Sequence, residues 1–70
     1  MDTQPLSTYQ LGRVQSLPIL RLVSIGAYLD GGIQDIPLPL RYLPAGSQVG
    51  DEVSVFVYQD NEGRLIATTL

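Results

Sequence analysis

The residues of this chain that could do chemistry are aromatic rings, arginines and carboxylates. Its 70 residues include four Tyr, one Phe, seven acidic and four basic residues, all of the latter Arg, and they contain no Cys and no His. Without imidazole, thiol or lysine amine, the chain lacks the usual zinc ligands, the usual general base and the amine of a Schiff base. No serine has a base to activate it. We therefore expect no enzymatic activity and no cofactor.

Aromatic rings and arginines together suit single-stranded nucleic acids, because rings stack on bases and guanidinium groups contact phosphates. Strand alternation places Ala27 and Leu29 on one face, which leaves Tyr28 on the other face as the best stacking candidate. Tyr42 is a second candidate, although it could instead cover one end of a barrel. The candidate phosphate or base contacts are Arg21, Arg41 and Arg64. The alternative for each arginine is a surface ion pair, which contributes little.

The formal net charge of −3 limits how strongly such a surface could bind RNA. It excludes a strongly basic nucleic-acid module but not binding through a local patch. If three arginines contacted phosphates, the affinity would fall with salt with a logarithmic slope of only about −2. We therefore expect weak, salt-sensitive binding to single-stranded RNA.

Phe56 and Tyr58 form a second group of interest. Both point away from the core, because Val53, Val55 and Val57 alternate with them along the clearest predicted strand. Two exposed rings in register make a patch that could bind RNA, but such a patch is more typical of contact with a neighbouring domain or a protein partner. The alternative function is therefore an acidic barrel that contacts proteins through Phe56 and Tyr58 and binds no RNA.

Several carboxylates gather in predicted turns, at Asp30 and Asp35 and again at Asp60 and Glu62. Their spacing does not match an EF-hand loop, which needs more oxygen ligands in a fixed order. Acidic residues in turns usually accept hydrogen bonds from the turn backbone. A glycosidase-type pair would need a sugar cleft between two carboxylates, for which so short a chain has little room. We predict no metal site.

The elements that must position these residues are short strands separated by turns. We predict strands over residues 12–24, 27–29, 36–38, 53–58 and 64–69. In the first strand, Leu17 and Ile19 alternate but Leu22 falls out of phase with them, which indicates a β-bulge. Two turns are also predicted, a hairpin at residues 30–32 and a helical or 3₁₀ turn at residues 40–43.

The third predicted strand carries two prolines. Ile36, Leu38 and Leu40 are expected to face inward, and Pro37 and Pro39 outward. Because proline donates no ladder hydrogen bond, this strand should be short or lie at an edge. Five strands with one turn between the third and fourth are typical of an all-β OB-fold Greek-key barrel, and an SH3-like barrel is the alternative.

The chain is expected to hold one domain, at residues 11–70, after a polar lead-in at residues 1–10. No apolar run approaches the ~20 residues that a membrane helix needs. The first residues also lack the basic and apolar regions of a signal peptide. We therefore expect no membrane contact and a cytoplasmic protein.

Several segments of the chain resemble known RNA-binding domains. Residues 26–30 resemble the aromatic-containing signature of ribosomal S1-type domains, and residues 49–53 with 64–67 are similar to the second half of that domain. A narrower resemblance is to the first S1-like domain of the bacterial conserved virulence factor B family. It is carried by residues 38–44, 55–58 and 64–69. The resemblance spans about residues 11–70.

This resemblance implies an OB barrel that binds RNA, does no catalysis and takes part in regulating gene expression. It also implies neighbouring S1-like domains and a winged-helix domain in a longer chain. The sequence departs from the S1-type pattern in three ways: Ile25 replaces an aromatic residue, Pro39 replaces a frequent histidine, and lysine is absent. Each departure removes stacking surface or charge. The combined prediction is a weak RNA-binding module that forms one arm of a larger regulator.

Overall fold

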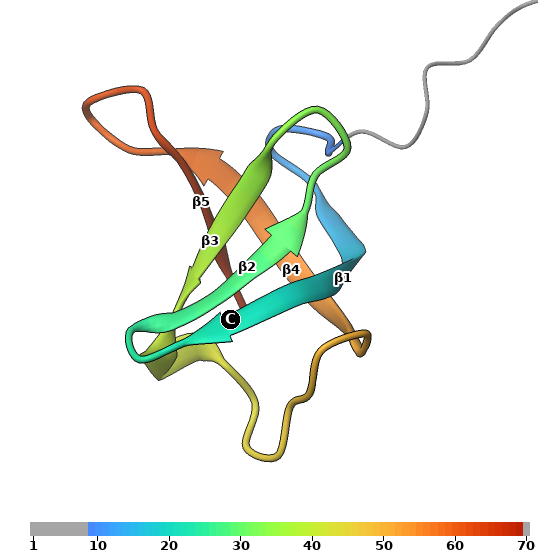
Figure 1. Cartoon of the computed structure of the whole chain (residues 1–70). Coiled ribbons are helices and arrows are strands. Elements are labelled where there is room, and N and C mark those ends of the chain that lie inside the picture. Colours follow the sequence, from blue (N-terminus) through green and yellow to red (C-terminus); the bar gives the residue numbers. More distant parts are fainter. Residues whose placement is uncertain (1–8, 70) are drawn as a thin grey trace, which may run out of the picture.

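A computed structural model describes residues 9–69 and confirms the predicted all-β fold (Figure 1). Its elements are β1 (Val14–Val23), β2 (Gly26–Asp30), β3 (Asp35–Pro39), the 3₁₀ turn η1 (Leu40–Tyr42), β4 (Glu52–Gln59) and β5 (Leu65–Thr68). The five strands form one antiparallel sheet in the order β3-β2-β1-β4-β5. Because β3 also contacts β5, the sheet curls into a nearly closed barrel, which is consistent with an OB-fold.

The core lies inside the barrel and receives side chains from every strand. Alternate residues of each strand point inward, as strand geometry requires. In β4, for example, Val53, Val55 and Val57 are buried while Ser54 and Phe56 are exposed, as predicted. The buried apolar residues are Leu17, Ile19, Ala27, Leu29, Ile36, Leu38, Val53, Val55, Val57, Leu65 and Ala67.

The prediction that Leu40 faces inward is wrong. Ile36 and Leu38 are buried, but Leu40 is 56% exposed. The chain leaves strand geometry after Pro39 and begins η1 at Leu40. A period of two residues therefore no longer decides which side of the chain faces the core.

Strand β1 bends where it changes partners. Residues 14–18 pair with β4, and residues 19–23 pair with β2. The register shifts between Ile19 and Arg21, which confirms the predicted bulge. Pro18 forms the last pair with β4, at the end of that ladder, where its missing N–H disrupts little. The bend lets one long strand serve both halves of the barrel.

The seam between β3 and β5 differs from the other strand contacts. These two strands touch, but within residues 9–69 they share no paired register (Figure 1). Pro37 and Pro39 pair with Tyr28 and Gly26 of β2. Alternate N–H groups of a strand face opposite edges, so prolines can occupy the positions that face β5 without breaking the ladder to β2. The prolines thus remove two donors from the β3 side of the seam.

Of the predicted lead-in, Tyr9 and Gln10 are described, and residues 1–8 lie outside the described residues. The backbone N–H of Tyr9 donates to the carbonyl of Gly31 at 2.9 Å, and the Tyr9 side chain packs against the core. Tyr9 is therefore tied to the barrel. Across the described residues, no helix is long and apolar enough to cross a membrane.

The turn between β4 and β5 is organised by the Asp60 carboxylate. Its Oδ1 accepts hydrogen bonds from the backbone N–H groups of Glu62 and Arg64 at 2.8 and 2.9 Å. Its Oδ2 accepts one from Nε of Arg64 at 2.9 Å. These bonds lower the pKa of Asp60, and the backbone N–H of Arg64 is the largest cause.

Acidification is therefore expected to loosen this turn. A carboxyl group with a lowered folded-state pKa stabilises the fold above its unfolded value, near 3.8, and that stabilisation is lost as the pH falls through the folded value. We expect the amide NMR signals of Glu62 and Arg64 to move together with a midpoint below 3.8. Asp60→Asn should remove this transition. A midpoint above 3.8 in the wild type would contradict the account.

Candidate nucleic-acid interface

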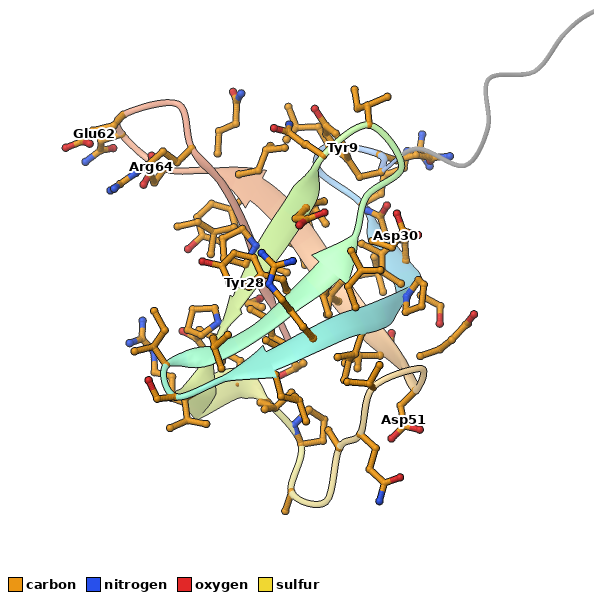
Figure 2. The ribbon with its side chains drawn as sticks, viewed as in Figure 1. Tyr9, Tyr28, Asp30, Asp51, Glu62 and Arg64 are labelled. Carbon is orange, nitrogen blue, oxygen red and sulfur yellow. The ribbon has the colours of Figure 1, made fainter. Side chains whose placement is uncertain are left out.

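Tyr28 lies on the outer face of β2 (Figure 2), and Arg21 of β1 covers its ring. The guanidinium carbon of Arg21 stands 4.4 Å from the centroid of the Tyr28 ring, a cation–π contact. Nη1 of Arg21 also donates to Oδ2 of Asp35 at 3.0 Å. A base that arrives on this side would therefore stack on the flat guanidinium group, with the tyrosine ring beneath it.

An apolar pocket of about 170 Å³ adjoins Tyr28 between β2 and β3. Ile25 and Pro39 both line it. Its apolar lining suits a flat or aliphatic group better than a phosphate. The full lining is Val23, Ile25, Gly26, Ala27, Tyr28, Pro37, Leu38 and Pro39.

A larger polar groove of about 440 Å³ lies at the end of the β3–β5 seam where both strands begin. Its polar side chains include Gln34, Gln59 and Arg64, all of which can donate hydrogen bonds to a base or a phosphate. Pro37 lines both this groove and the apolar pocket, so the two hollows meet at its ring. The full lining is Tyr9, Gln34, Asp35, Pro37, Gln59, Gly63, Arg64 and Leu65.

Arg64 is held by two carboxylates of its own turn. It lies 2.9 Å from Asp60 and 3.6 Å from Glu62, and its side chain is 70% exposed. Arg21 and Arg64 thus form surface ion pairs, which the sequence offered as the alternative to contacts with RNA. Figure 2 shows Arg64 and Glu62 at the tip of the β4–β5 hairpin, well away from Tyr28.

Arg41 and Tyr42 form a separate pair in η1. The guanidinium carbon of Arg41 stands 4.9 Å from the centroid of the Tyr42 ring. Tyr42 is half-buried and packs against the core, and its carbonyl accepts a 2.6 Å hydrogen bond from Oγ1 of Thr69. The five predicted RNA contacts therefore fall into three places: Arg21 with Tyr28, Arg41 with Tyr42, and Arg64 at the groove.

Phe56 and Tyr58, the residues predicted to contact a partner, lie side by side on β4. Phe56 and Tyr58 stack with ring centroids 6.4 Å apart and an interplanar angle of 22°. Phe56 is 37% exposed, and Val14, its neighbour on β1, is 70% exposed. Within residues 9–69, no group of three or more His, Cys, Asp or Glu side chains is placed to hold a metal ion.

A comparison with protein families matches the S1 domain over residues 11–70. The match covers most of the 70 residues of the chain. The chain belongs to the S1 domain family. Comparisons with curated proteins and with solved structures gave no match. Membership of this family suggests an RNA-binding module without catalytic activity.

Three residues of the groove in this S1 domain were missed by sequence reasoning, namely Tyr9, Gln34 and Gln59. Tyr9 belongs to a polar segment that reads as a lead-in, and an isolated glutamine has no periodic or spacing signal. The structure brings the three together from the N-terminal segment, the β2–β3 loop and β4. Only the folded chain makes them neighbours, so no sequence signal could have shown the groove.

Proposed function

We propose that this S1 domain binds single-stranded RNA across the outer face of β2 and β3. The observation that carries the proposal is the Arg21 guanidinium laid over the Tyr28 ring beside two hollows that meet at Pro37. Bases stack on flat aromatic and guanidinium groups whatever their sequence. The apolar pocket would take one flat group, and the polar groove would take a later nucleotide of the same strand near Arg64.

Binding by the isolated domain should be weak, because its arginines are shared with carboxylates. RNA that contacts Arg21 or Arg64 competes with Asp35, Asp60 and Glu62, which already hold these side chains. The net charge of −3 adds a general repulsion. Stacking contributes about 1–3 kcal/mol per base, so two bases that contribute about 2–2.7 kcal/mol each support a Kd in roughly the 0.1–1 mM range.

Weak binding fits a module that works beside others. The resemblance of residues 38–44, 55–58 and 64–69 to the conserved virulence factor B family supports this part of the proposal. We place the domain as one arm of a larger, cytoplasmic, RNA-binding regulator of gene expression. Linked modules raise the effective concentration of one another, so several weak contacts add to a useful affinity.

The salt dependence of RNA binding tests the proposal. Fluorescence anisotropy with a labelled, mixed-sequence single-stranded RNA should show binding at low salt that fades towards physiological salt. With one to three arginines contacting phosphates, we expect a logarithmic slope between about −1 and −2. A duplex of the same sequence should bind more weakly, because its bases are not free to stack. Equal binding of the duplex, or none of the single strand, would refute the proposal.

A further inference from the structure

Arg41, which forms no ion pair within residues 9–69, lies beside aromatic residues. Arg21 pairs with Asp35, and Arg64 pairs with two carboxylates of its turn. Across residues 9–69, Arg41 forms no ion pair and lies over the ring of Tyr42 instead. The positive charge of Arg41 is therefore less compensated by nearby carboxylates than the charges of Arg21 and Arg64 are.

The turn η1, which carries Arg41, lies beside the β4–β5 hairpin. The pKa of Arg41 is raised, first by hydrogen bonding with the Tyr42 side chain, then by the electrostatic influence of Tyr42 and, more weakly, of Tyr58. The backbone places η1 near Phe56, because the Tyr42 carbonyl accepts a hydrogen bond from Oγ1 of Thr69, and the preceding residue, Thr68, pairs with Phe56. The turn that carries Arg41 therefore meets the β4–β5 hairpin next to Phe56.

The aromatic pair of β4 begins next to η1. Tyr58 stacks on Phe56, and Phe56 is exposed next to Val14. The sequence had divided these residues between an RNA site and a protein interface. The structure places them together, and we call Arg41, Tyr42, Phe56 and Tyr58 the cation–aromatic surface.

We propose that the cation–aromatic surface is a second contact for single-stranded RNA, with a phosphate at Arg41 and a base on Phe56 and Tyr58. This inference rests on the proposed function of the β2–β3 face. An uncompensated guanidinium group selects an anion, a stacked aromatic pair selects a planar group, and a nucleotide offers both. An apolar protein face would bury Arg41 without a counter-charge, which is unfavourable, so RNA fits the surface better.

The two RNA contacts lie within reach of one strand. Pro39 lines the apolar pocket beside Tyr28, and η1, which carries Arg41, begins at the next residue. An RNA strand that leaves the pocket past Pro39 therefore meets Arg41 first and the aromatic pair of β4 after it. The second contact would lengthen the RNA site without adding a new kind of ligand.

Amide NMR titrations with a short single-stranded RNA at low salt test this inference. We compare the wild type with Arg41→Gln and with a matched control, Arg13→Gln. Arg13 is also exposed and forms no ion pair within residues 9–69, and its recorded contact with β4 is the backbone carbonyl that accepts from the N–H of Val57, which the substitution keeps, so both variants remove one positive charge. Because the change at Arg41 is on the surface, we expect both variants to fold.

We expect the wild type to show RNA-dependent shifts at residues 41–43 and 56–58. Arg41→Gln should abolish those shifts and weaken binding about two- to fivefold, the size expected for one exposed charged contact. It should keep the shifts at residues 26–30, and Arg13→Gln should keep both sets. Absent shifts at residues 56–58, or equal losses in the two variants, would overturn the second contact. If residues 26–30 also failed to respond, the proposed function itself would fall.

Discussion

Gly26→Ala is expected to destabilise the domain by about 3–4 kcal/mol, a large part of the total stability of so short a chain. A Cβ at Gly26 would lie 2.1 Å from the carbonyl oxygen of Leu38 and 2.9 Å from the amide nitrogen of Leu40. Both are backbone atoms, so they cannot move aside without disturbing the pairing of β2 with β3. The φ angle of +147° adds strain, because side chains disfavour it.

Gly63→Ala provides the matched control. Gly63 has a positive φ of +79°, but a Cβ there would meet nothing within 4 Å. We expect this variant to lose only about 1–2 kcal/mol, the cost of a left-handed residue with a side chain. Urea unfolding followed by circular dichroism measures both variants. Equal losses would mean that backbone conformation, and not the contact with β3, makes glycine necessary at position 26.

Tyr28→Ala is expected to weaken RNA binding about tenfold, within the 1–3 kcal/mol that stacking contributes per base. The substitution removes the ring beneath Arg21 and one wall of the apolar pocket. Without the ring, the guanidinium group of Arg21 keeps its ion pair with Asp35 but loses its flat support. Anisotropy at low salt, with the same RNA for each variant, measures the change.

Tyr28→Phe separates stacking from hydrogen bonding. Phenylalanine keeps the ring and the cation–π contact with Arg21, so we expect affinity within about twofold of the wild type. The urea unfolding midpoint of each variant shows whether the barrel stays folded under the binding conditions. Wild-type affinity in a folded Tyr28→Ala variant would remove Tyr28 from the RNA site, and a loss in Tyr28→Phe as large as in Tyr28→Ala would assign the effect to the hydroxyl group.

Local patterns were sufficient to predict the strands of this domain. The Val53–Val55–Val57 alternation predicted β4, and the phase slip before Leu22 predicted the bulge of β1. Leu40 was placed wrongly because a run of alternating residues continues past the point where the backbone turns into η1. The end of a short strand depends on its partners, and the pattern of one segment does not contain them.

The candidate site was predicted by residue type but not by arrangement. Composition identified the arginines and the aromatic rings, yet the ion pair of Arg21 with Asp35 joins strands that are not consecutive in the chain. The proximity of η1 and Phe56 likewise depends on how η1 meets the β4–β5 hairpin. Closeness to the conserved virulence factor B family and the place of the domain in a longer regulator stay predictions.

The central claim is that RNA binds across the outer face of β2 and β3, and an amide NMR titration of the wild-type domain tests it most directly. A short, mixed-sequence single-stranded RNA is added at low salt, and salt is then raised. We predict shifts at Tyr28, Leu38 and Arg64 that fade as salt increases, with the loop at residues 45–51 unchanged. No movement at Tyr28, Leu38 and Arg64 with RNA at about 1 mM, the weakest affinity proposed, would contradict the account.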